Sequence, residues 1–204
     1  MWRHSAGSDR RVGKSESSRD IKIISAALLL LVFPQLGLSA DNPTPELTLE
    51  TYFAATRDWD AARISNMIHP EALSQFRQTF DRAFSGSKKS LALEELLPLF
   101  TLSTVEEYDE LSDREIYQRL NETIAQSQPQ IVKMMASSQF EIVGKFAEGD
   151  VTYVTYILGI DVDGRLVEQE VVQKLKKYQG SWYLLLPSTA AASIAAIESR
   201  YNLQ

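Results

Sequence analysis

The spacing of hydrophobic residues changes once along this chain, from a helical period to a strand period. Between residues 45 and 136, apolar side chains recur every three or four positions, most clearly at Leu73, Phe76, Phe80 and Phe84. That spacing places them on one face of an amphipathic helix. From residue 138 to 187, apolar and polar residues alternate, as in a strand with one buried face. The pattern predicts a helical half followed by a sheet half.

Capping signals predict where the helices begin. Thr44 before Pro45 starts a helix over residues 45–57, and Asp60 caps a short second helix. Pro70 begins a third helix that ends at Gly86. Ser112 with a glutamate three positions later is a capping box, and opens another helix. A final helix is expected over residues 188–201, so the fold class is α+β, with N-terminal helices on a four-stranded antiparallel meander and a C-terminal helix.

Two short turns predict the register of the sheet. Asp163-Gly164 and Gln179-Gly180 are typical two-residue hairpin turns. Counting back from them gives the expected cross-strand neighbours: Leu158 with Gln169, Tyr156 with Val171, Leu175 with Leu184, and Gln173 with Leu186.

The first turn of the sheet, at Glu148-Gly149-Asp150, is ambiguous between two and three residues. A three-residue loop places Phe140, Ile142 and Phe146 on the same side as Tyr156, whereas a two-residue loop turns all three outward. Burial of these side chains favours the three-residue loop. Gly159, in the middle of a strand, predicts a bulge or a bend that curves the sheet.

Residues 1–40 have the pattern of an export signal. Six basic residues precede Ile23 to Phe33, a run of 11 uncharged residues, and Leu38-Ser39-Ala40 offers a cleavage site with small residues. The run is shorter than the roughly 20 residues that span a bilayer. We therefore expect cleavage after Ala40, a single domain over residues 41–204, and a periplasmic or extracellular location. The alternative is an uncleaved membrane anchor.

Charge narrows the class of partners. Residues 1–40 contain six of the 21 basic and three of the 27 acidic residues, so the remaining chain has a formal net charge of −9. That charge disfavours nucleic acid and anionic membrane surfaces. The chain has no cysteine, so an exported form relies on its core without disulfides.

Short motifs in both halves carry a resemblance to a known fold. In the helical half they are Tyr52-Phe53-Ala54-Ala55, Asp58-Trp59-Asp60 and His69-Pro70. In the sheet half they are Glu148-Gly149-Asp150, Asp163-Gly164 and Gly180-Ser181-Trp182-Tyr183-Leu184. In this order they resemble the nuclear-transport-factor-2-like (SnoaL-like, cystatin-like α+β) superfamily over about residues 45–80 and 138–187. The resemblance implies a curved sheet wrapped around a helix. The resulting cone holds a small molecule in some members and is filled with side chains in others.

The face of the sheet that should point into this cone is almost entirely apolar and contains no Asp, Glu or His. The predicted ligand-binding residues are Tyr52, Trp59, Tyr156, Gln169 and Gln173. The alternative for the two glutamines is structural, because buried amides normally bind backbone groups. No catalytic residue, metal ligand or cofactor is assigned.

Catalysis would require a carboxylate or imidazole inside the cone. Asp58, Asp60 and His69 are the candidates, although Asp60 also suits a helix cap and His69 a helix end. We therefore expect an exported, non-catalytic binding domain. Its partner is a small apolar molecule or a protein, and a second copy of the chain is one such protein partner. The alternatives are a small isomerase, dehydratase or hydrolase, and a membrane-tethered component of an envelope assembly.

Overall fold

The computed structural model describes residues 43–162, 164–187 and 190–203. The expected signal segment and its cleavage point lie outside these residues. The helices are α2 (Pro45–Asp58), α3 (Ala61–Ser65), α4 (Pro70–Ser85), α5 (Lys89–Leu96), the 3-10 helix η1 (Leu97–Phe100), α6 (Val105–Asp109), α7 (Asp113–Ser127), α8 (Pro129–Ala136) and α9 (Ala190–Tyr201). The strands are β1 (Gln139–Glu148), β2 (Val151–Val162), β3 (Arg165–Tyr178) and β4 (Ser181–Leu184). The predicted α+β class is confirmed.

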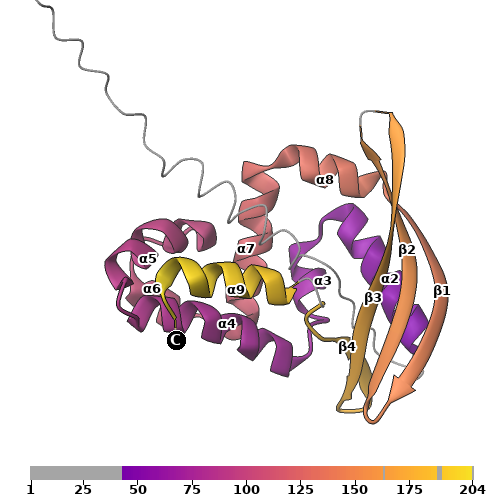
Figure 1. The fold of residues 1–204 in the computed structure, drawn as a ribbon, viewed down its shortest axis with the longest axis horizontal. Coiled ribbons are helices and arrows are strands. Elements are labelled where there is room, and N and C mark those ends of the chain that lie inside the picture. Colours follow the sequence, from indigo (N-terminus) through magenta and orange to yellow (C-terminus); the bar gives the residue numbers. More distant parts are fainter. Residues whose placement is uncertain (1–42, 163, 188–189, 204) are drawn as a thin grey trace, which may run out of the picture.

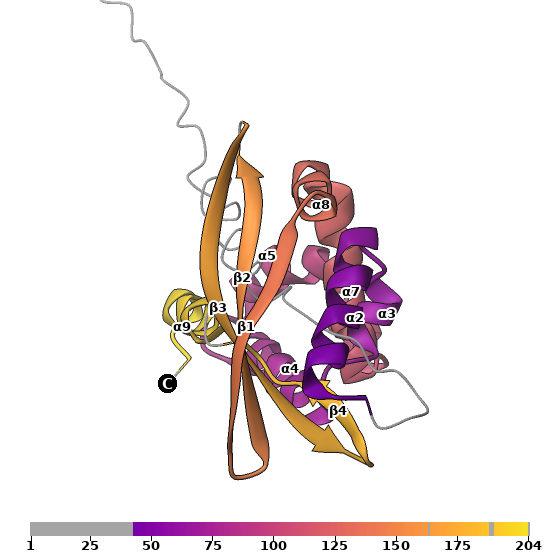
Figure 2. The same cartoon turned by 90° about the vertical axis from the view of Figure 1, so that its right-hand side faces the viewer.

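The helices lie on one side of an open antiparallel sheet of order β1-β2-β3-β4 (Figure 1). Helices α2 and α8 contact β2, and α2 also contacts β4. The long strands β2 and β3 twist and extend beyond α8 at one end, as the view turned by 90° shows (Figure 2). Helix coverage of the sheet is therefore incomplete at the β2–β3 turn.

The predicted helix starts are confirmed by their caps. The Thr44 hydroxyl accepts a hydrogen bond from the Leu47 N–H at 3.2 Å, and Asp60 caps α3. Ser112 forms the expected capping box at the start of α7. A second capping box at Thr104 opens α6, an element that the sequence reading missed although the same Thr-x-x-Glu signal is present there.

The register that the two later turns predict is also confirmed. Leu158 lies opposite Gln169, Tyr156 opposite Val171, and Leu175 opposite Leu184. Gly164 and Gly180 have positive φ angles of 79° and 87°, which these tight turns require.

The first turn differs from the prediction. Glu148 pairs with Val151, so the loop has two residues, and the register of β1 shifts between Ile142 and Gly144. This bulge returns Ile142 and Phe140 to the inner face, as predicted, but leaves Phe146 outside. Phe146 is 56% exposed and stacks on Tyr153 with ring centroids 4.5 Å apart. The prediction was therefore wrong for Phe146, because the extra residue sits in the strand and not in the loop.

Two further predictions about the sheet, a bulge at Gly159 and the pairing of Gln173 with Leu186, differ from the structure. Gly159 pairs regularly with Glu168, so the sheet has no bulge there. Its missing side chain instead makes room for Leu166, whose Cδ1 would lie 3.1 Å from a Cβ at position 159. Strand β4 ends at Leu184, so Gln173 does not pair with Leu186.

Helix α9 is held on the helical layer by a buried carboxylate. The side chain of Glu95 on α5 is 5% exposed and accepts hydrogen bonds from Arg200 Nε and the Tyr201 hydroxyl, each at 2.8 Å. Arg200 Nη2 completes a bidentate contact with the other carboxylate oxygen. Lys88 Nζ binds the Arg200 carbonyl at 2.6 Å. The C-terminal helix is therefore joined to the domain by specific polar contacts.

Candidate functional site

Aromatic rings from α2, β1 and β2 meet beneath the sheet. Phe53 stacks on Phe140 with ring centroids 3.8 Å apart, and its edge faces Tyr156 at 5.1 Å. Tyr52 lies beside Phe53 at 5.4 Å. Tyr52 and Phe53 are adjacent on α2, and both are buried. Of the predicted ligand-binding residues, the structure thus brings Tyr52 and Tyr156 to the same apolar cluster below the sheet.

The two tyrosines in this cluster remain neutral phenols. Burial raises the pKa of Tyr52 and that of Tyr156 well above the usual range. The Tyr156 hydroxyl is buried and has no hydrogen-bond partner among the described residues. Such a group can donate or accept a hydrogen bond but cannot serve as a base near neutral pH.

Trp59 connects helices α2 and α7. Its backbone adopts the left-handed conformation, with φ of 49°, at the C-cap of α2. Its indole Nε1 donates to the Asn121 carbonyl at 3.0 Å, and Asn121 in turn donates to the Tyr117 carbonyl at 2.8 Å. These contacts give Trp59 a part in helix packing.

The two predicted glutamines lie on the same face of β3 but in different surroundings. Gln173 is fully buried, and its Nε2 donates to the carbonyls of Lys174 and Leu185 at 2.9 and 2.7 Å. Its Oε1 has no partner among the described residues. Gln169 is exposed, because this part of β3 extends past the helices. The structure therefore does not bring the two amides into one site.

The candidate catalytic groups occupy separate places. Asp58 is largely exposed and lies 3.7 Å from Arg63, while Asp60 caps α3. His69 is buried at the start of α4, where its Nδ1 accepts a hydrogen bond from the Glu71 N–H at 3.1 Å. Burial lowers the pKa of His69 despite the opposing effect of the Glu71 carboxylate. Its neutral imidazole thus works as a helix cap, at the end of the sheet marked by Tyr178 and Tyr183.

Metal-ligating side chains do not gather within the ranges that the structure describes. No group of three or more His, Cys, Asp or Glu side chains in those ranges is arranged to hold a metal ion. Across the same ranges, no helix has the length and apolar character needed to cross a bilayer.

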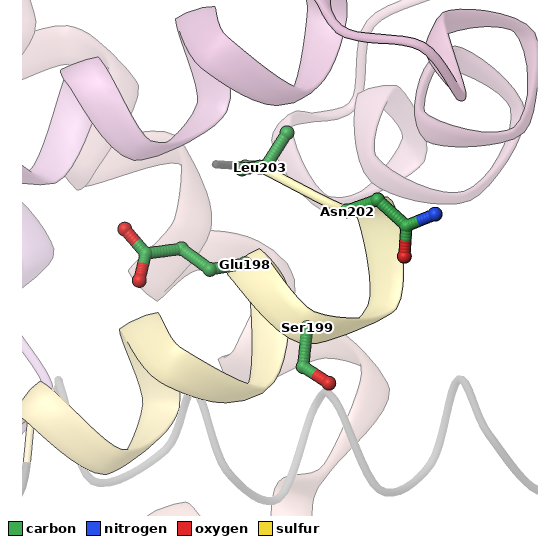
Figure 3. A pocket seen from close by; sticks show the side chains of 4 residues that line it. All are labelled: Glu198, Ser199, Asn202 and Leu203. Atoms are coloured by element: carbon green, nitrogen blue, oxygen red, sulfur yellow. The ribbon is translucent and has the colours of Figure 1, made fainter.

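A recess of about 520 Å³ lies beside the end of α9 (Figure 3). It is lined by Glu198, Ser199, Asn202 and Leu203. The Glu198 carboxylate already binds Arg82 at 2.5 Å. The recess was not expected from the sequence, because no motif marks these residues.

Apolar surface on the sheet was also not predicted from the sequence. Val162, Leu166 and Val167 at the β2–β3 end are 46%, 49% and 53% exposed. Val143 and Phe146 are exposed on β1. Alternation correctly placed Val167 on the inner face, but only the reach of the helices decides whether that face is covered.

No protein-family model, curated protein or solved structure matches this chain. The α+β architecture and the residues that it exposes therefore carry the functional argument.

Proposed function

We propose that this protein is an exported, non-catalytic binding domain that holds a protein partner at the β2–β3 end of its sheet. The observation that carries this proposal is the exposure of Val162 and Val167, which are diagonal neighbours on the inner face of that hairpin; Leu166 is exposed on its outer face. Contiguous apolar surface is costly to leave in water and commonly marks an interaction site. We also propose that the chain is a divergent member of the nuclear-transport-factor-2-like superfamily, which agrees with its curved sheet and helical layer.

A protein partner is favoured over catalysis by the positions of the ionisable groups. Asp58 and Asp60 engage Arg63 or a helix end, and His69 is used as a cap. The partners in these contacts are Arg63 and the Glu71 backbone, and not Phe53 or Tyr156 of the ring cluster. A general base would have to face a substrate in a partly dry pocket.

Site-specific photo-crosslinking tests the proposed surface. A photoreactive phenylalanine analogue at Val167 is expected to give a discrete adduct in cells of the native host, identified by mass spectrometry. The same analogue at Glu94, exposed on α5, serves as the control position. Val162→Ser should remove at least 80% of the Val167 adduct, because Val162 lies diagonally beside Val167 on the same face and supplies apolar contact area there. Equal adducts at both positions, or an adduct insensitive to Val162→Ser, would contradict the proposal.

A small ligand beneath the sheet is the second candidate, favoured by two buried polar atoms. Tyr156 Oη and Gln173 Oε1 both lack partners among the described residues, and the two side chains are diagonal neighbours on the inner face. Buried polar atoms normally have a partner, so a bound molecule could supply it. Native mass spectrometry of protein from its own host should then show a bound mass that Tyr156→Phe reduces. If Tyr156→Phe binds equally, or no bound mass is seen, this candidate is wrong.

A further inference from the structure

The outer edge of β3 is only partly paired. Strand β4 pairs with β3 from Leu175 to Tyr178, and the chain then leaves the sheet. The Leu185 N–H still donates to the Lys174 carbonyl at 2.9 Å, and the Gln173 amide holds the Leu185 carbonyl. Among the described strands, none pairs with residues 165–173 of β3 on this side.

The direction of the backbone groups along this edge follows from the Lys174 contact. The N–H and C=O groups of one strand residue point to the same side of the strand, and those of the next residue point to the other side. The Lys174 carbonyl points toward the side where β4 and Leu185 lie. The backbone N–H and C=O groups of the alternate residues Leu166, Glu168, Glu170 and Val172 therefore point to that side as well. Residues 165–170 are all exposed. The edge therefore presents a row of backbone donors and acceptors to solvent.

This edge lacks most of the features that protect free strands. Residues 165–173 contain no proline, and their pairing with β2 is regular. The opposite edge strand β1, by contrast, is interrupted by the bulge between Ile142 and Gly144. Long regular edges are templates for strand addition, and bulges blunt them.

The negative charges of Glu168 and Glu170 favour some added strands over others at this edge. Glu168 and Glu170 point to the outer face, and Glu141 lies in the same cross-strand row as Glu170, across Ile157. An antiparallel second copy, centred so that both free edges overlap fully, would place Glu168 opposite Glu170. Like charges directly opposite are destabilising. A strand that carries lysine or arginine opposite these glutamates is favoured instead, with aliphatic residues facing Val167 and Val171.

We propose that the free edge of β3 binds an extended segment of the protein partner in which basic and aliphatic residues alternate. The segment would add a strand to the sheet: its backbone bonds to Leu166, Glu168, Glu170 and Val172, and its basic side chains pair with the two glutamates. This inference rests on the proposed function and specifies the chemistry of the partner.

A synthetic peptide tests the charge part of the proposal. The probe is a fluorescein-labelled seven-residue peptide, Thr-Lys-Val-Arg-Val-Lys-Thr, titrated with the purified full-length protein by fluorescence anisotropy. We expect saturable binding that weakens at least tenfold in the double variant Glu168→Lys, Glu170→Lys. The matched control is the double variant Glu141→Lys, Glu148→Lys, which makes the same change in charge on the same face but on β1, at the opposite edge of the sheet, and should alter binding less than twofold. If both variants lose the same peptide affinity, the effect comes from the net charge of the protein and not from Glu168 and Glu170 in particular. That result would overturn this part of the proposal.

Backbone methylation of the peptide tests strand addition itself. Two versions carry N-methyl groups on alternate residues, one on each set. Only one set can face β3, so one version should bind at least tenfold more weakly and the other should bind normally. If both bind like the parent peptide, or the parent does not bind at all, strand addition is wrong. A Val167 adduct that depends on Val162 would still support the proposed function in that case, so the two failures are distinguishable.

Discussion

Replacing Arg200 with methionine is expected to lower the free energy of unfolding by about 3 kcal/mol, because it leaves a buried carboxylate without its cation. Glu95 is almost fully buried, and Arg200 binds both of its oxygens. The Arg200 hydrogen bonds hold the pKa of Glu95 below its usual value. Methionine keeps most of the aliphatic stem, so the loss reports on the charge more than on packing. Urea denaturation followed by circular dichroism at pH 7 measures it.

Arg82→Met is the control for this prediction. Arg82 also joins α9 to the helical layer, through Glu198, but its side chain is 52% exposed. Exposed pairs contribute between about 0 and 1 kcal/mol, so a small change is expected. Equal losses in the two variants would show that burial of Glu95 does not decide how α9 is held.

Replacing Phe53 with alanine is expected to lower the free energy of unfolding by about 4 kcal/mol, because it opens a cavity in the buried core. The Phe53 ring is 1% exposed and contacts both Phe140 and Tyr156. Its loss removes the ring that links α2 to β1 and β2. Thermal and urea unfolding of the variant measure the change.

Phe146→Ala is the matched control and also tests the bulge in β1. Because Phe146 lies on the outer face against Tyr153, its removal should cost about 1 kcal/mol or less. If Phe146 pointed inward, as an unbulged strand with a three-residue loop requires, the two alanine variants would show similar losses. That result would overturn the shift in the register of β1 between Ile142 and Gly144.

The sequence predicted a feature correctly where the interacting residues lie close together in the chain. Thr44, Asp60 and Ser112 cap helices through contacts three residues away, so their roles could be predicted from neighbouring positions. The lengths of the turns before Arg165 and Ser181 determine which residues pair across them. The registers of β2 with β3 and of β3 with β4 could therefore be predicted. The missed helix α6 had an equally local signal at Thr104.

The candidate site was less predictable. Alternation placed Tyr156, Gln169 and Gln173 on one face of the sheet, and the pairing agrees. It could not separate Gln173, which is buried and bound to the departing chain at Leu185, from the exposed Gln169. Their surroundings depend on helices that are more than 30 residues away in sequence.

By itself, the sequence determined the helix starts at Thr44, Asp60 and Ser112, the order of the strands and the register set by the two later turns, because each follows from residues close together in the chain. Only the tertiary structure decided that a bulge in β1 turns Phe146 outward, that rings from α2, β1 and β2 meet under the sheet, and that the β2–β3 end remains uncovered. Those features depend on where distant helices pack against the sheet, and side-chain periodicity alone carries no information about how far that packing reaches.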